Sequence, residues 1–217
     1  LEFDACRYDG QLISNQYVKE LKKFINFMPI CPEIEIGMGV PRDTIKIVEN
    51  KSRKILFQPE TGKDFSTEMI NFSKDYLGSL KKVDGFILKS NSPSCGVKSA
   101  KIYSNNKGPA LGKGYGFFAS EAVSLFPNHP IEEEKRLNNV FLREHFYTAI
   151  FTIADFRSVD SIKALYEYHA KHKYLFMSYN QLLMTKMGRA AANDKNRELD
   201  AVLVEYYELL LLIFKKK

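Results

Sequence analysis

Several features that define whole classes of protein are scarce or missing in this sequence. The 217 residues contain three cysteines and no tryptophan. A small, odd number of cysteines argues against the dense disulfide framework of a small secreted domain, and no secretory signal peptide is recognisable. We therefore expect a cytoplasmic protein whose thiols stay reduced.

Long hydrophobic runs are missing too. The run 209–214 near the end of the chain stops at three lysines. A membrane-spanning helix needs about 18 or more apolar residues, so no membrane partner is expected. Apolar residues nevertheless make up 45% of the chain, enough to fill the cores of one large or two small globular domains.

Acidic residues are scarce in one stretch, although the net charge of the whole chain is a modest +6. Between residues 81 and 113 a single acid, Asp84, accompanies a set of lysines: Lys81, Lys82, Lys89, Lys98, Lys101, Lys107 and Lys113. Two interpretations stay open, namely a solvated lysine face and an electropositive rim for a phosphate-bearing substrate.

Helical and strand patterns alternate in the first half of the chain. Helical spacing of apolar residues extends over 14–27 and 61–80, and short strand-like runs occupy 28–31, 44–48, 55–58 and 83–88. This alternation predicts an α/β fold with a small open sheet, whose ligands characteristically bind at the carboxyl ends of strands.

Glycine nearly disappears after Gly116, and no strand pattern follows it. Helical patterns extend over 133–155, 158–177, 179–192 and 198–214. The two prolines of segment 126–130 interrupt helix on both sides, so we place a domain boundary there. The prediction is an α/β domain at 1–126 followed by an all-helical domain at 130–217.

Two cysteines lie at the ends of predicted strands. Cys31 begins the triplet CPE at 31–33, and Cys95 lies in the loop SPSCG at 92–96. Functional loops gather at such ends, so we expect the two thiols to share one site. Residue types alone leave three roles open: ligation of a metal or iron–sulfur cluster, nucleophilic catalysis, or burial as small apolar side chains.

Longer motifs carry a resemblance to a known family. The stretches CPEIEIGMGVPR at 31–42, DGFILK at 84–89 and SPSCG at 92–96 resemble the thiouracil desulfidase family. The region from about Pro130 onward, with HAKHKY at 169–174 and MGR at 187–189, resembles a helical domain of unknown function that is often fused behind it. The fused arrangement is similar to that of desulfidases acting on 4-thiouridine in transfer RNA.

The resemblance implies a [4Fe-4S] cluster held by three cysteines, which leaves one iron open to bind sulfur. The matching positions are Cys31 and Cys95, and the family register from the RYDG motif at 7–10 puts the third cysteine one position before Leu1. Cys6 ranks below these as a ligand. The same comparison implies that a strand precedes Leu1 and that the helical domain reaches about half its usual extent at Lys217.

The resemblance also implies a catalytic glutamate and a catalytic serine. Glu33, two residues after a ligand, would activate water or carry a proton beside the metal, and is otherwise a surface residue or helix cap. Ser92 or Ser94 would donate a hydrogen bond to the substrate or cluster sulfur, and is otherwise a turn former. The choice between the two serines stays open.

Five basic residues are predicted to bind substrate: Arg7, Arg42, Lys89, Lys171 and Lys173. The first three belong to the family motifs and would orient the base or neutralise phosphate, with structural ion pairs as an equal alternative. The last two lie in segment 169–174, whose two histidines are also spaced as metal ligands could be. We favour RNA docking there, although core packing of the nearby tyrosines stays equally open.

The resulting hypothesis is an iron–sulfur hydrolase that converts 4-thiouridine in transfer RNA to uridine with release of sulfide. The fused helical domain favours RNA as the partner. One alternative is desulfuration of a small, free thiolated base. Another is a non-enzymatic, metal-stabilised RNA-binding module whose cysteines are structural.

Overall fold

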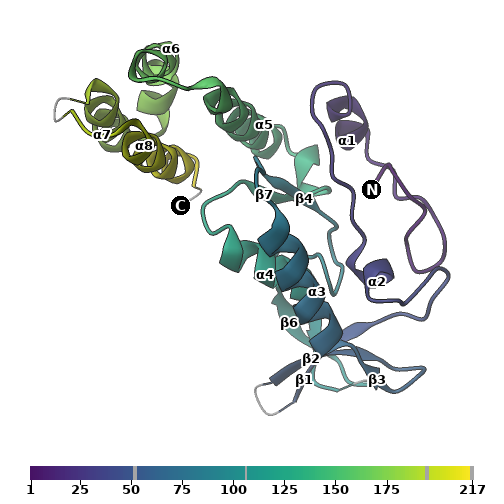
Figure 1. Ribbon diagram of the computed structural model, residues 1–217. Coiled ribbons are helices and arrows are strands. Elements are labelled where there is room, and N and C mark those ends of the chain that lie inside the picture. Colours follow the sequence, from purple (N-terminus) through teal and green to yellow (C-terminus); the bar gives the residue numbers. More distant parts are fainter. Residues whose placement is uncertain (51–52, 106, 194–195, 216–217) are drawn as a thin grey trace. The chain divides into compact units, whose positions relative to one another are not determined.

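The computed structural model describes residues 1–50, 53–105, 107–193 and 196–215 (Figure 1). The chain divides into two compact units. The sheet unit comprises Leu1–Pro127 with Ile131–Arg143, and the helical unit comprises Asn128–Pro130 with Glu144–Lys217. We describe each unit by itself.

Two sheets form the framework of the sheet unit. The larger has the strand order β3-β2-β1-β5-β6. Within it β1 and β5 are parallel and the other pairs are antiparallel. The bounds are β1 Lys46–Asn50, β2 Arg53–Gln58, β3 Lys63–Asp64, β5 Ala100–Tyr103 and β6 Ala110–Gly114. The smaller sheet pairs β4 (Phe86–Leu88) with β7 (Ile131–Glu133) in parallel.

Helices α3 (Ser66–Ser79) and α4 (Phe117–Leu125) pack against each other in this unit. Apolar side chains that alternate along the central strands meet the apolar stripes of these helices, because strands have a period of two and helices of 3.6 residues. The resulting core includes fully buried Ile47, Leu56, Met69 and Phe118.

Two short helices complete the sheet unit. In α1 (Gln16–Leu21) the Asn15 side chain accepts hydrogen bonds from the first free amides of the helix, as an N-cap residue does. In α2 (Pro32–Glu35) Cys31 is the N-cap and proline occupies the first helical position, where its missing N–H costs nothing. Helix α2 therefore begins at the predicted site.

The helical unit is built from α5 (Val140–Asp155), α6 (Ile162–Tyr179), α7 (Gln181–Ala192) and α8 (Leu199–Ile213). The first turn of α5 belongs to the sheet unit. Short 3-10 turns lie at η1 (Arg136–Asn138) and η2 (Phe156–Ser158). The core of the unit contains Leu165, Phe176, Met187, Val202 and Tyr206, each with an exposed fraction of 0%.

The predicted fold class is confirmed: open, mixed α/β sheets precede a helical region. Two local predictions were wrong. The run 28–31 is irregular rather than a strand, and the helix predicted over 14–27 is the six-residue α1. Pro29 disfavours helix in the residue before it, and a helix this short depends on tertiary packing rather than on its own pattern.

Strand β7 was also not predicted, because no strand pattern is visible after Gly116. It consists of Ile131 and two buried glutamates, so it lacks the alternation of apolar and polar residues that marks a strand. The segment around the predicted domain boundary alternates between units: 128–130 belong to the helical unit and 131–143 to the sheet unit.

Among the described residues, no helix is both long enough and apolar enough to cross a membrane.

Candidate functional site

The loop that carries Cys95 follows the carboxyl end of β4 and leads into β5. The Ser92 hydroxyl accepts hydrogen bonds from the backbone amides of Ser94 at 3.1 Å and Cys95 at 3.0 Å. The Gly96 amide donates to the Ser92 carbonyl at 2.9 Å. Ser92 therefore closes a tight turn around Cys95, which is the turn-forming role that serine often has in loops.

The beginning of α4 holds the same loop from the other side. Its otherwise unpaired amides bind loop carbonyls: Gly116 N–H donates to Gly96 at 2.8 Å, Phe117 N–H to Pro93 at 3.0 Å and Ala119 N–H to Ser94 at 3.0 Å. Gly116 lies so close that an added Cβ would be 2.4 Å from the Ser94 carbonyl oxygen. This position therefore requires glycine because of close approach.

Cys31 lies at the start of α2 beside Glu33. Its thiol donates to Glu33 Oε2 at 3.4 Å and approaches the Cys6 carbonyl oxygen at 3.8 Å. Only 8% of Glu33 is exposed. A buried carboxylate therefore lies directly against one of the predicted ligand sulfurs.

Electrostatics show that the cysteines and Glu33 form one group. Burial, together with the neighbouring Glu33 carboxylate, raises the pKa of the Cys31 thiol to about 12. Burial also raises the pKa of Cys95 well above its ordinary value, and the charges of Glu33, Cys31 and Cys6 act in the same direction. These charge effects indicate that the three cysteines and Glu33 lie near one another.

The two serines of the loop differ in their exposure to solvent. Ser94 has an exposed fraction of 0%, and its hydroxyl has no hydrogen-bond partner within the described part of the chain. Ser92 is half-buried, and a hydrogen bond from its side chain lowers the pKa of Cys95. Ser92 is thus the serine that lies beside the sulfur and retains access to solvent.

The basic residues of the family motifs have identifiable partners. Arg7 pairs with Asp9 at 2.8 Å, and Lys89 Nζ pairs with Glu134 at 2.9 Å. The guanidinium of Arg42 donates to the carbonyls of Cys6 at 3.1 Å and Gly39 at 3.0 Å. Arg42 therefore holds the segment carrying Cys6 against the loop that follows α2.

The donor set fits an iron–sulfur cluster. Two largely covered thiols beside a buried carboxylate are costly to ionise, and a bound metal removes that cost because coordination deprotonates a thiol. In the ranges that the structure describes, no three Cys, His, Asp or Glu side chains are grouped as a site for one metal ion.

The predicted RNA-docking residues of α6 also have partners. Lys171 Nζ donates to Asp155 Oδ2 at 2.8 Å, and His172 Nε2 lies 2.9 Å from the same oxygen. His169 Nδ1 lies 3.0 Å from the Tyr206 hydroxyl. The ammonium of Lys173 lies 5.0 Å from the ring centre of exposed Tyr174.

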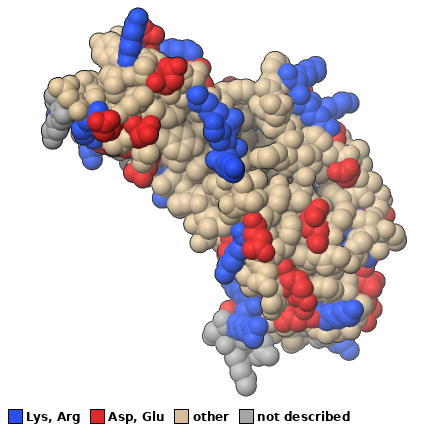
Figure 2. All heavy atoms as spheres, in the orientation of Figure 1, with Lys and Arg blue, Asp and Glu red and all other residues tan. Residues whose placement is uncertain are grey.

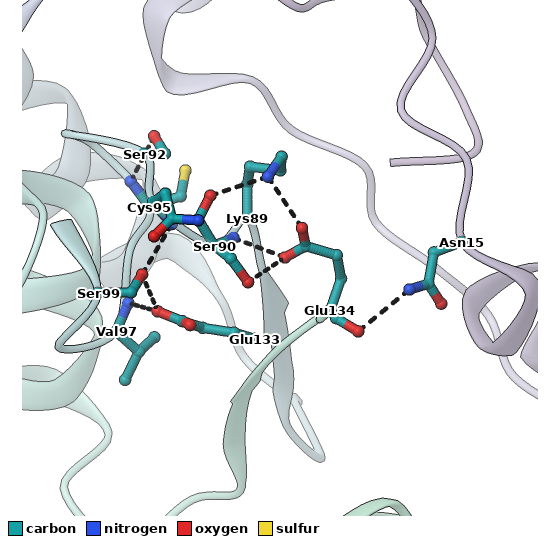
Figure 3. Close-up of polar contacts among 10 residues, drawn as sticks. Asn15, Lys89, Ser90, Ser92, Cys95, Val97, Ser99, Glu133 and Glu134 are labelled. Atoms are coloured by element: carbon teal, nitrogen blue, oxygen red, sulfur yellow. Dashed lines mark hydrogen bonds and ion pairs between the residues drawn. The ribbon is translucent and has the colours of Figure 1, made fainter. Parts of the chain in front are cut away.

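Sequence reasoning missed Glu133 and Glu134, which lie at the end of β7 and contact both ends of the Cys95 loop (Figure 3). The available signal was the run of three acids at 132–134, in a chain whose net charge is positive. Such a run is normally a solvated surface, so residue types alone do not place it against the Cys95 loop.

Comparisons with known proteins agree with the motifs. The sequence profile of 2-thiouracil desulfurase matches residues 1–134, and that of a protein of unknown function (DUF1722) matches 173–217. A Bacillus subtilis (strain 168) protein named "Uncharacterized protein YbbK" is 26% identical over 98 residues, which are 42% of this chain and 65% of that protein. The chain thus covers just under two thirds of that relative.

A solved structure titled "[4Fe-4S]-dependent thiouracil desulfidase TudS" is 25% identical to this chain, with a TM-score of 0.47. The match covers 62% of this chain and 86% of the solved one.

Proposed function

The chain belongs to the 2-thiouracil desulfurase family, a family of enzymes, and we propose that it is a [4Fe-4S]-dependent desulfidase of thiolated uracil bases. The observation that carries the proposal is the 3.4 Å contact between the Cys31 thiol and the buried Glu33 carboxylate, with Cys95 near enough for the Glu33 and Cys31 charges to raise its pKa. Cys31 and Cys95 would hold the cluster together with a third thiolate. Cys6 ranks below these two as a ligand.

The chemistry supplied by a bound cluster with three thiolate ligands is an iron with an open coordination position for sulfur. Glu33 supplies the base. Its carboxylate is buried and fixed beside Cys31, so it can take a proton from a water molecule that attacks the thiocarbonyl carbon.

Ser92 is the serine that we assign to proton handling. Its hydroxyl lies beside Cys95 and the residue is half-buried, whereas Ser94 has an exposed fraction of 0%. The reaction is a hydrolysis: water adds a C–O bond, the C–S bond breaks, and sulfur leaves as sulfide. Water gives up two protons: Glu33 takes the first and passes it to the departing sulfide, and the second replaces the proton that Ser92 donates to the sulfur. The net reaction converts C=S and water to C=O and hydrogen sulfide, so no oxidant is required.

The substrate has two candidates. The family match favours a thiouracil-type base, since the family is named for 2-thiouracil. The surface of the sheet unit favours RNA as a second candidate, because exposed Lys101 and Lys113 face each other directly on β5 and β6. Like charges in that position destabilise a sheet, and a phosphate between them would relieve the repulsion.

The deciding experiment is anaerobic reconstitution with iron and sulfide, followed by separate incubation with free 2-thiouracil, free 4-thiouracil and transfer RNA containing 4-thiouridine. Loss of thiocarbonyl absorbance and release of sulfide are followed together. We expect iron-dependent sulfide release from the base, and release from the transfer RNA if the second candidate is correct.

Two outcomes contradict the proposal. A protein that holds iron but releases no sulfide from any of these substrates is not a desulfidase of thiolated uracil. A protein that stays colourless after reconstitution and still binds transfer RNA is a binding module with structural cysteines.

A further inference from the structure

Two buried carboxylates at the end of β7 contact the Cys95 loop. Neither is hydrogen-bonded to Cys31, Cys95 or Glu33 in the contacts described below. Glu133 and Glu134 have exposed fractions of 3% and 2%. Glu133 Oε1 accepts hydrogen bonds from the Val97 amide at 2.5 Å and the Ser99 hydroxyl at 2.5 Å. These contacts hold the end of the loop that leads into β5.

Glu134 holds the other end of the loop (Figure 3). Its Oε2 accepts from the Ser90 amide at 2.5 Å and the Ser90 hydroxyl at 2.8 Å, and its Oε1 pairs with Lys89 at 2.9 Å. The Glu134 carbonyl accepts from Asn15 Nδ2 at 3.1 Å. The same residue therefore also joins the loop to the N-terminal cap of α1.

The backbone between these contacts is strained. Asn91 and Lys98, near the two ends of the loop, have φ angles of +59° and +66°. A residue with a side chain avoids this left-handed region unless its surroundings hold it there, and lysine avoids it more than asparagine does. The Ser99 hydroxyl also accepts from the Asn91 amide at 2.7 Å, which ties the two ends together.

Burying a carboxylate in a protein core costs free energy because the charge loses its hydration. Each buried carboxylate must find several donors, or its burial destabilises the fold. Every donor to the two carboxylates just described belongs to the loop or to its two flanks, so the carboxylates stabilise one conformation of that loop specifically. A fully satisfied buried polar network specifies a unique geometry more strongly than apolar packing does.

We propose that Glu133 and Glu134 are positioning residues that hold the Ser92–Cys95 turn in its ligand-presenting conformation. None of the hydrogen bonds described for these two carboxylates goes to Cys31, Cys95 or Glu33. The catalytic consequence rests on the proposed function, whereas the ordering of the loop does not. The loop's conformation is therefore tested first in protein without iron.

The test uses Glu133→Gln, Glu134→Gln and the matched control Glu132→Gln. Glu132 lies on the same strand with an exposed fraction of 4%, but alternation directs its side chain to the opposite face from Glu133. Its Oε1 accepts from Arg136 at 2.6 Å and from the Glu133 amide at 3.1 Å, and a glutamine oxygen can keep both bonds. An amide keeps the size of the side chain but presents N–H groups to donors. Ser99→Ala removes one donor while leaving both glutamates in place.

The readout is the rate at which iodoacetamide alkylates Cys95 relative to Cys31 in the metal-free protein, measured by mass spectrometry of peptides. Losing a hydrogen bond to a charged group shifts a local opening equilibrium by about 10-fold or more. Cys95 should therefore react about 10-fold faster in Glu133→Gln and in Glu134→Gln. Ser99→Ala should show a smaller rise. The rate at Cys31 and both rates in Glu132→Gln should stay unchanged.

A second readout is the amount of iron bound per chain after reconstitution, which should fall in Glu133→Gln and Glu134→Gln. The circular dichroism spectrum of these variants should match that of the parent protein. Equal acceleration at Cys31 and Cys95, or equal effects of all three glutamate variants, would show general destabilisation and overturn the proposal. Unchanged Cys95 reactivity would overturn it as well. If the parent protein shows no desulfidase activity but Cys95 becomes selectively reactive in the Glu133 and Glu134 variants, the positioning role stands and only the proposed function is rejected.

Discussion

Cys31 and Cys95 are each presented by backbone contacts of their neighbours. Cys31 is held by the first turn of α2, and Cys95 by the Ser92 turn and the start of α4. Their sulfur atoms therefore stay available for ligation although both side chains are largely covered. At this scale the decisive question is which thiols bind iron.

We predict that Cys31→Ala or Cys95→Ala abolishes iron retention after reconstitution, because a cluster with one protein thiolate fewer is lost to exchange. The measurement is iron per chain together with the visible absorbance of the cluster. Cys6→Ala is the matched comparison and should retain most of its iron. If it loses iron as completely as the other two, Cys6 is a ligand and our ranking of the thiols is wrong.

Glu33→Gln should keep the fold and the iron but lose turnover by about 10²-fold or more, as expected when a positioned general base is removed. The amide preserves the shape of the side chain beside Cys31. Sulfide release and iron content are measured on the same samples. Near-normal turnover would make Glu33 a structural partner of the Cys31 thiol.

Helix α4 is the element that most directly shapes the site, because its first amides bind three carbonyls of the Cys95 loop. A helix start offers several donors that its own turns cannot satisfy, and here the loop satisfies them. The loop and the helix should therefore order together. This coupling depends on a close approach at Gly116.

Gly116→Ala should displace the Ser94 carbonyl, since the new Cβ would lie 2.4 Å from it. Overpacking of this kind costs about 1–3 kcal/mol, so we expect a lower urea midpoint together with reduced iron binding. Gly112→Ala on β6 is the control, because an added Cβ there meets no described atom within 4 Å. Equal behaviour of the two variants would show that the coupling of α4 to the loop is weak.

Charge is the property that matters at the scale of the whole molecule. On the face drawn in Figure 2, basic side chains of the helical unit stand among acidic ones. On α6, Lys171 is paired with Asp155, and Lys173 lies near the ring of Tyr174. If RNA is the substrate, we expect these two lysines to exchange their contacts with Asp155 and Tyr174 for contacts with phosphate.

The combined variant Lys171→Ala with Lys173→Ala tests that role. We expect a raised KM for thiolated transfer RNA and a shallower salt dependence, with a slope that falls by about one unit for each phosphate that the variant no longer binds. Turnover of free 4-thiouracil should not change, because a free base has no backbone to bind. Lys163→Ala on the same helix is the control, with a side chain that is 88% exposed. Equal effects on both substrates, or none on either, would rule out α6 as the RNA-docking element.

Local pattern predicted much of this protein. The motifs around Cys31 and Cys95 identified the family, and the family profile matches 1–134. The change from alternating strands and helices to helices alone predicted the fold class, because burial on one face leaves a period in the sequence. Gly37 and Gly39, in the motif at 31–42, have φ values of +83° and +70°, in the left-handed region that favours glycine.

Tertiary structure decided what depends on distant partners. Glu133 meets Val97 and Ser99 across 36 and 34 positions, and Glu134 meets Ser90 across 44. No periodicity records such pairs, since the donors are backbone amides and small hydroxyls that occur everywhere. The difference in access between Ser92 and Ser94 likewise comes from the packing of α4 on the loop. Sequence alone thus determined the family and the class of fold, while the three-dimensional packing determined which side chains are buried and which ones form hydrogen bonds to the Cys95 loop.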